Sequence, residues 1–554
     1  MAEPNHFADI VDTPSHRIRC GILASAAAIA TAAIAAYSNS ISVPFVFDDP
    51  FAIASNPTIR HLWPPWAPLF PPHGQGLTVE GRPLLNLSLA LDYAVSGTRV
   101  WSYHATNLLI HILAGLTLFG IARRTLTRWK DTFPDPWFAA VIALIWTLHP
   151  LQTESVTYIV QRAESQMGLF YLLTLYFFIR YSESEGSLQV SGLRFQVFAV
   201  AACFCCAATK EVAATAPIAV LLYDRTFISG TFADGWRRHR RLYLGLGSTW
   251  ILLGILVLGS GNRGGTAGFG IGVAPWAYAL TQCDAITRYL RLALWPRPLI
   301  FDYGAAWVKH PADVLPQGLI VAALVLAGCI AFFRRGAGPF GFAVAWFLLI
   351  LAPTSLIPGD RQTIAEHRMY LPLASVVAAI LCGAWILAGK WRRARAIAFG
   401  CGAAGLALGC LGATLDRNRD YSSAVELYAD TVAKRPDNVL ARYNLGMALA
   451  AAGRPGEATA QFEATLRLVP EFPQAEYNLG KALAAGGRMD DALPHFAAAI
   501  RINPNYAEAH HELGCALLQA GRRAEARWHF NAAWLIRPDD EDSRRKRDQI
   551  DAGR

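Results

Sequence analysis

Two adjacent carboxylates, Asp48 and Asp49, are the residues of this sequence best suited to acid–base chemistry. They follow the first long apolar run and lie among Phe45, Phe47 and Phe51. Partial burial among these rings and repulsion between the two charges would each raise a carboxylate pKa. The pair could therefore act as a general base, hold a cation, or simply end a helix.

Ionisable and amide side chains recur where later apolar runs begin or end. Some are arginines that could bind a phosphate, because a guanidinium group presents paired donors to its oxygens. Others could hold those arginines in place. The phosphate candidates are Arg82, Arg162, Arg361 and Arg368, and the supporting candidates are His104, Asn107, His149, Glu154, Glu164, Lys210, Glu211 and Glu366. Together they predict a polar cavity at one end of a group of membrane helices.

The elements that carry these residues are predicted to be transmembrane helices. Of the 554 residues, 53% are hydrophobic and only 16% are charged, whereas soluble domains have about 25% charged residues. This composition excludes a disordered chain, a fibrous chain and a small disulfide-stapled domain. Since about 20 apolar residues cross a bilayer, we expect about eleven spans, at 18–37, 104–122, 137–156, 166–181, 195–209, 211–224, 242–259, 316–333, 339–357, 369–388 and 396–415.

Basic clusters predict the orientation of these spans, because Lys and Arg collect in cytoplasmic loops. The clusters lie at 123–130, 237–241, 334–335 and 390–395. An even number of spans must then separate any two of them. Segment 276–295 carries Asp284, Arg288 and Arg291, so it is predicted to be an amphipathic helix on the outer surface.

This orientation predicts a multi-pass inner (plasma) membrane protein with a cytoplasmic N-terminus. The first loop, 38–103, and the C-terminal domain are then extracytoplasmic. The net charge of +9 is explained by the cytoplasmic clusters and does not indicate a nucleic-acid partner.

After about residue 415 the sequence becomes a polar repeat with a period of 34 residues. Leu-Gly pairs at 445, 479 and 513, Phe at 462, 496 and 530, and Pro at 436, 470, 504 and 538 all follow this period. These columns are the signature of the tetratricopeptide repeat (TPR), in which two helices pack antiparallel. The predicted fold is therefore all-α. It consists of a polytopic membrane domain at 1–415, an α-solenoid of TPRs at 416–538 and a polar tail at 539–554. The solenoid comprises a half repeat and three full repeats.

The ordered motifs resemble those of a known family. They are Phe-Asp-Asp at 47–49, Arg-Pro-Leu at 82–84, Tyr-His-x-x-Asn-x-x-x-His at 103–111, His-Pro-x-x-Thr-Glu-x-Val at 149–156, Arg-Ala-Glu at 162–164, Lys-Glu at 210–211 and Glu-His-Arg-Met-Tyr-Leu-Pro at 366–372. Followed by TPRs, this series is similar to the transmembrane and TPR (TMTC-like) protein O-mannosyltransferases. The chain looks like a bacterial relative over nearly its whole length.

The resemblance implies a C-type glycosyltransferase (GT-C) fold with an extracytoplasmic active site. It implies a polyprenyl-phosphate-linked sugar, usually mannose, as the donor and Ser or Thr of a protein as the acceptor. Asp48 would be the base or would orient the acceptor, and Asp49 would assist. Glu154 and Glu366 would hold the phosphate-binding arginines. No metal is required, although the two aspartates could bind a divalent cation.

The TPR domain is predicted to hold an extended acceptor peptide. Asn444 and Asn478 precede the Leu-Gly step of their repeats, where an amide can hydrogen-bond a peptide backbone, and Glu512 replaces them in the third repeat. Two alternatives remain at this stage. The same fold could act on a glycolipid or cell-wall acceptor, or the chain could be a non-catalytic membrane scaffold that presents TPRs.

Overall fold

The computed structural model describes residues 14–552 except 73–76, 130–131, 135, 185–188, 261–267, 269–271, 305–306, 335, 360–362 and 389–391. It divides into two units. The membrane unit comprises Met1–Phe301 and Ala305–Ser423, and the repeat unit comprises Asp302–Gly304 and Ala424–Arg554. In the described part of the chain every regular element is a helix, as the sequence predicts.

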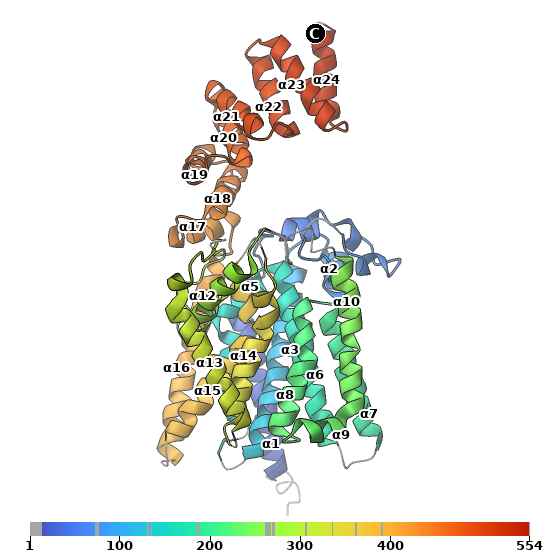
Figure 1. The fold of residues 1–554 in the computed structure, drawn as a ribbon, viewed down its shortest axis with the longest axis vertical. Coiled ribbons are helices and arrows are strands. Elements are labelled where there is room, and N and C mark those ends of the chain that lie inside the picture. Colours follow the sequence, from blue (N-terminus) through green and yellow to red (C-terminus); the bar gives the residue numbers. More distant parts are fainter. Residues whose placement is uncertain are drawn as a thin grey trace, which may run out of the picture. The chain divides into compact units, whose positions relative to one another are not determined.

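The membrane unit is a bundle of helices (Figure 1). Its helices are α1 Pro14–Ala36, α2 Pro83–Ser96, α3 Trp101–Leu126, α4 Trp137–Leu148, α5 Thr153–Thr157, α6 Arg162–Glu183, α7 Gln189–Ala207, α8 Ala216–Phe227, α9 Phe232–Gly247, α10 Thr249–Gly259, α12 Pro275–Leu294, α13 Leu315–Phe333, α14 Gly338–Leu356, α15 Pro372–Leu387 and α16 Arg392–Arg419. In Figure 1, α2 and α5 lie at one end of this unit and α9 lies at the other.

Several of these helices are long and apolar enough to cross a bilayer. Within the described residues there are six, at Ile18–Ala36, Trp101–Leu126, Phe232–Gly259, Pro311–Phe333, Gly338–Leu356 and Ala396–Arg419. Helices α4 and α8 have 12 residues each, and at 1.5 Å per residue such a helix is only about 18 Å long. The predicted number of eleven spans therefore stays a prediction.

The expected span at 137–156 is wrong at its C-terminal end. Helix α4 ends at Leu148 because the next residue, His149, precedes Pro150 and adopts an extended conformation with φ −66° and ψ 130°. Steric clash with a following proline disfavours the helical conformation. The chain then passes through short helical turns, including α5, before α6 begins at Arg162. This interruption leaves the polar residues of the His-Pro-x-x-Thr-Glu-x-Val motif at the end of the bundle.

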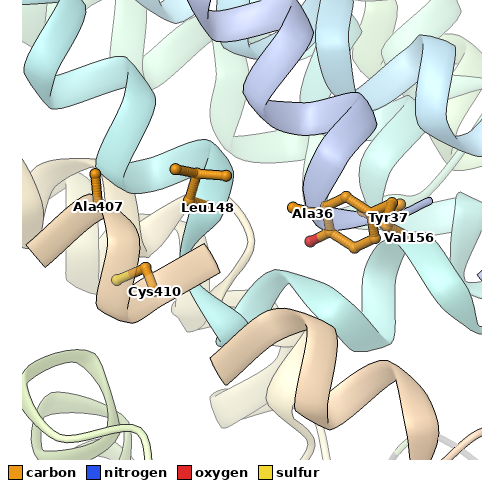
Figure 2. Packing of buried hydrophobic residues seen from close by; sticks show 6 residues of the cluster. All are labelled: Ala36, Tyr37, Leu148, Val156, Ala407 and Cys410. Carbon is orange, nitrogen blue, oxygen red and sulfur yellow. The ribbon is translucent and has the colours of Figure 1, made fainter. Parts of the chain in front are cut away.

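An apolar cluster joins the helix ends that support this region (Figure 2). Its buried members come from α4, α5, α16 and the C-terminal end of α1, and they are Ala36, Tyr37, Leu148, Val156, Ala407 and Cys410. Burying apolar side chains of this size stabilises the fold by about 25 cal/mol per Å². The cluster therefore fixes the first and last spans against the interrupted segment.

Arginine side chains bring several helix ends together at one end of the bundle. Arg124 at the end of α3 bonds Glu183 at the end of α6, with 2.9 Å between Nη1 and Oε2. Arg128 Nη1 donates to the carbonyl of Phe227 at the end of α8 at 2.9 Å. Arg225 of α8 donates in turn to the carbonyl of Phe332 at the end of α13. The N-terminal ends of α3, α6, α8 and α13 therefore point to the opposite end of the bundle.

The repeat unit contains the predicted TPR helices. They are α17 Ala424–Lys434, α18 Val439–Ala451, α19 Pro455–Leu468, α20 Pro473–Ala485, α21 Met489–Ile502, α22 Ala507–Gln519, α23 Arg523–Ile536 and α24 Glu541–Asp551. A Cβ added at Gly480 would lie only 2.7 Å from the ring of Phe496. Glycine is required there because the aromatic ring of the second helix occupies the space of a side chain.

Two boundaries differ from those expected. Helix α16 continues to Arg419, so the two units separate after Ser423 rather than at residue 415. The polar tail contains α24, and the Ser543 hydroxyl on this helix lies 2.6 Å from His511 Nδ1 of the last repeat. This helix covers the end of the solenoid, as a capping helix does.

Candidate active site at the helix ends

Asp48 and Asp49 have different surroundings although they are neighbours in sequence. Asp49 is completely buried. Its Oδ1 accepts from the Val160 amide at 2.8 Å and its Oδ2 from the Val46 amide at 3.1 Å. Burial raises the pKa of Asp49 to about 8, although these backbone donors oppose the shift. Asp49 therefore ties the first loop to the interrupted segment before α6.

Asp48 is only half-buried. Its Oδ2 accepts a hydrogen bond from the Thr78 hydroxyl at 2.8 Å, and its amide donates to the Tyr158 hydroxyl at 3.1 Å. The preceding residue, Phe47, has a φ of +51°. A bulky residue rarely adopts this left-handed conformation, and such strain concentrates at functional sites. Of the two aspartates, Asp48 is the one that is accessible to solvent.

Thr78 also connects Asp48 to a buried arginine. Arg82 donates from Nη1 to the Thr78 carbonyl at 2.8 Å, and its Nη2 lies 3.4 Å from Glu211 Oε1. Arg82 immediately precedes Pro83, which begins α2. The predicted base is thus hydrogen-bonded to the segment that carries one predicted phosphate-binding arginine.

A second ion pair involves Lys210, the residue that directly precedes Glu211, and this pair is buried. Lys210 Nζ lies 2.7 Å from Glu164 Oε2, and both side chains are at most 6% exposed. Burial lowers the pKa of Lys210, although the neighbouring Glu164 carboxylate opposes the shift. Since Glu211 binds Arg82, the Lys-Glu motif joins the start of α6 to the start of α2.

Arg162 is held by protein groups on several sides. Its Nη2 lies 2.6 Å from Asp92 Oδ2 and donates to the Tyr103 carbonyl at 2.8 Å, and its Nε donates to Asn107. The side chain is completely buried. A buried arginine with this set of acceptors links α2, α3 and α6, which favours a structural role over the predicted phosphate contact.

Glu154 and Glu366, which are expected to hold the phosphate-binding arginines, have other partners among the described residues. Glu154 accepts from both the backbone amide and Nδ1 of His367, each at 2.8 Å. Glu366 Oε2 lies 3.6 Å from Arg417 Nη2. Sequence reasoning missed Arg417 because it lies near the end of the last apolar run, outside every motif. Arg417 lies just after that run, among the charged residues Asp416, Arg419 and Asp420, so no signal distinguished it.

The remaining predicted residues occupy several kinds of position. His104 Nε2 lies 2.8 Å from the carbonyl of Val43 and fixes the first loop on α3. Arg368 is half-buried and donates to the Thr363 carbonyl at 3.2 Å. Arg361 lies outside the described residues. Where the chain is described, no group of three or more His, Cys, Asp or Glu side chains is arranged to hold a metal ion.

His149 shows why the interrupted segment keeps its shape. Its Nδ1 accepts from the amide of Leu151, and its Nε2 lies at hydrogen-bond distance from the carbonyl of Ala293, both at 3.2 Å. This arrangement requires a neutral ring with the proton on Nε2. Burial lowers the pKa of His149 to about 4, so the ring is neutral at physiological pH.

In the repeat unit, the predicted acceptor-binding asparagines are half-buried. Asn478 Nδ2 donates to the Tyr443 hydroxyl of the preceding repeat and to the Gln474 carbonyl, both at 2.8 Å. Its amide oxygen remains a potential acceptor for another group. The peptide-binding role of Asn444 and Asn478 stays a prediction.

Comparison with known proteins supports the family suggested by the motifs. Tetratricopeptide repeat models match residues 411–470, 451–507 and 483–550. The mouse protein O-mannosyl-transferase TMTC2 is 35% identical over 162 residues, which are 28% of this chain and 18% of the relative. Drosophila melanogaster Tmtc2 is 29% identical over 298 residues, 51% of this chain and 30% of the relative. The matches thus span less than a third of each relative's length.

A solved structure of YrrB, described as a TPR protein with an unusual peptide-binding site, is 24% identical and covers 30% of this chain and 86% of its own, with a TM-score of 0.22. This score is too low to support an argument. The chain is a multi-pass membrane protein with C-terminal TPRs that is similar to the TMTC protein O-mannosyl-transferases.

Proposed function

We propose that this protein is a membrane glycosyltransferase that transfers a sugar, mannose in the first instance, from a polyprenyl-phosphate donor to a Ser or Thr hydroxyl of a protein. One observation supports this proposal most directly. The half-buried Asp48 accepts from Thr78, whose carbonyl in turn accepts from the buried Arg82. Thr78 therefore links a potential proton acceptor to a potential phosphate ligand. The named activity of the relatives fits such a pair.

The proposed chemistry is a single displacement. The acceptor oxygen attacks the anomeric carbon of the donor, and Asp48 accepts the hydroxyl proton. The bond between the anomeric carbon and the phosphate oxygen breaks, so the configuration inverts and the phosphate leaves with the lipid. Fixed cations stabilise the charge that develops on the leaving group. Arg82 is the first candidate, because it donates to Thr78, which in turn donates to Asp48, and Arg368 is the second.

The proposed acceptor is a protein segment held in the TPR unit. A helical solenoid presents a continuous concave face on which an extended peptide can lie. Asn444 and Asn478 are the proposed backbone contacts on this face. The active site and the TPR unit then face the extracytoplasmic side, since the arginine-rich ends of the bundle face the cytoplasm. This scheme needs no metal ion.

The decisive experiment uses the full-length protein in lipid nanodiscs. Radiolabelled polyprenyl-phosphate-mannose and a periplasmic extract are added, and label is followed in protein and lipid fractions. We expect label on protein that alkali releases by β-elimination, as for a sugar linked to Ser or Thr. Label confined to glycolipid would contradict a protein acceptor, and absence of transfer in both fractions would contradict the enzymatic proposal.

A matched pair of variants separates the site from general effects. Asp48→Asn is expected to abolish labelling. Asp234→Asn removes a carboxylate of the first turn of α9, at the other end of the membrane unit (Figure 1). This second variant is expected to retain transfer, because α9 carries one of the basic clusters rather than the site.

A further inference from the structure

Segment 61–72 of the first loop exposes large aromatic side chains. Trp63, Trp66 and Phe70 have 80%, 60% and 64% of their surface exposed. The sequence contains no Asp, Glu, Lys or Arg between Arg60 and Glu80. Clustered apolar side chains of this size on a protein surface usually mark an interface with another protein or with a membrane.

The segment has a defined shape despite its exposure. The amides of Ala67 and Leu69 donate to the carbonyls of Pro64 and Trp66 at 2.9 and 3.0 Å. Asn86 of α2 donates to the Pro68 carbonyl at 2.8 Å. Prolines at 64, 65, 68, 71 and 72 restrict the backbone further. A segment ordered in this way loses little conformational entropy when its rings move from water into an apolar environment.

The segment adjoins helices whose outer faces are apolar. Helix α2, to which it is bonded, exposes Leu91 and Val95. The chain that follows it packs on the end of α10, since a Cβ at Gly81 would lie 3.3 Å from Ser260 Cβ. Figure 1 draws α2 above the end of α10. Helix α10 belongs to a candidate membrane span and exposes Ile255 and Leu258. The aromatic segment is thus continuous with lipid-facing surface.

We infer that Trp63, Trp66 and Phe70 anchor the first loop in the membrane, at the boundary between lipid headgroups and acyl chains. Indole rings favour this depth because they combine an apolar body with an N–H donor. The absence of charged residues between Arg60 and Glu80 fits this boundary better than it fits contact with a charged surface of another protein. Such an anchor would hold the loop that carries Asp48 and Thr78 at a fixed height relative to the bilayer. The inference does not depend on the proposed enzymatic activity.

Depth-dependent fluorescence quenching tests the inference on the full-length protein. The protein is placed in nanodiscs made with phospholipids brominated either near the headgroup or at the chain end. Trp63→Phe with Trp66→Phe keeps the aromatic bulk and removes two indole signals, so the difference from the unsubstituted protein reports these two residues. Trp528→Phe is the matched control, because Trp528 is 61% exposed but lies in the TPR unit.

We expect bromine near the headgroup to quench the Trp63 and Trp66 signal more than bromine at the chain end. Neither lipid should quench the Trp528 signal, whereas soluble iodide should. The inference is overturned if iodide quenches the Trp63 and Trp66 signal and neither brominated lipid does, which would assign the segment to water or to a protein partner. Stronger quenching by bromine at the chain end would also overturn it, because the segment would then be deeply inserted.

Discussion

At the scale of single residues, the two neighbouring carboxylates predict different consequences of the same substitution. Asp48→Asn keeps the size of the side chain but removes its basicity, and loss of a general base costs about a hundredfold to ten-thousandfold in rate. Donor binding should persist because the arginines remain. Mannose transfer and binding of the lipid-phosphate donor are the two measurements. Near-normal mannose transfer would refute the role of Asp48. Glu154 and Glu366 would then be the next candidates for the general base.

The control for this prediction is Asp49→Asn. An amide retains one acceptor oxygen but presents an NH₂ group to the second of the two backbone donors from Val46 and Val160. Leaving a buried donor without an acceptor costs about 1–3 kcal/mol. We therefore expect a protein that is less stable but retains more activity per folded molecule than Asp48→Asn.

His149 predicts a pH dependence of stability. Its pKa is about 4 in the folded protein, compared with about 6.5 in an unfolded chain. Between these values the unfolded state binds a proton that the folded state does not, so the free energy of unfolding falls as the pH is lowered from about 6.5 to about 4. The loss attributable to this group is roughly 3 kcal/mol.

Thermal unfolding of the protein and of His149→Asn, measured across this pH range, tests the prediction. Asparagine can still accept from the Leu151 amide but does not titrate. The variant should be less stable at neutral pH and should lose part of the acid-induced decrease. An unchanged pH dependence would show that His149 does not contribute to it.

At the scale of elements, the TPR helices allow a test of close packing. A Cβ at Gly480 would lie 2.7 Å from Phe496, whereas a Cβ at Gly456 would meet no atom within 4 Å. Gly480→Ala should destabilise the α20–α21 pair by about 1–3 kcal/mol through overpacking. Gly456→Ala should be neutral or stabilising by up to about 1 kcal/mol, since alanine favours helix.

Hydrogen exchange of the full-length protein distinguishes these two glycine variants. Amides of α20 and α21 should exchange faster in Gly480→Ala and no faster in Gly456→Ala. Equal protection in both variants would mean that the Phe496 ring can move aside without cost.

The acceptor-binding face gives a second prediction at this scale. Asn444→Ala combined with Asn478→Ala removes two potential contacts to a peptide backbone, each worth about 0.5–1.5 kcal/mol. The KM for a protein acceptor should rise, while transfer to a short peptide that bypasses the solenoid should not change. Asn505→Ala, at an exposed turn position, is the control and should affect neither. Equal losses on both acceptors would contradict the proposal.

At the scale of the whole molecule, the arginine-rich helix ends predict the topology. Hydrogen bonds from Arg124, Arg128 and Arg225 to Glu183, Phe227 and Phe332 bring the ends of α3, α6, α8 and α13 together. If that end is cytoplasmic, alkaline phosphatase fused after Arg554 should be active in a bacterial host. A fluorescent protein that matures only in the cytoplasm should be dark at the same position. The reverse pattern would mean that α12 crosses the membrane.

The sequence by itself determined the class of the fold, the TPR period and the motifs that resemble the TMTC family. These features depend on local periodicity, on the length of apolar runs and on residue identity, all of which are present in the linear chain. The Gly480–Phe496 contact illustrates this, because both residues belong to columns of the repeat, one small and one aromatic, that recur every 34 residues. The sequence also predicts the Asp48–Asp49 pair as the candidate base, from its apolar flanks and from the family resemblance.

Only the tertiary structure decided which charged residues of the motifs are occupied by contacts within the protein. Asp49 accepts from Val160, Arg162 binds Asp92, and Glu366 meets Arg417. These partners lie between about 50 and 110 positions apart in the chain, so no spacing rule could pair them. Burying a charge is costly unless it is paired or hydrogen-bonded. Three-dimensional packing therefore separates charges used for structure from Asp48, which stays half-buried beside Thr78.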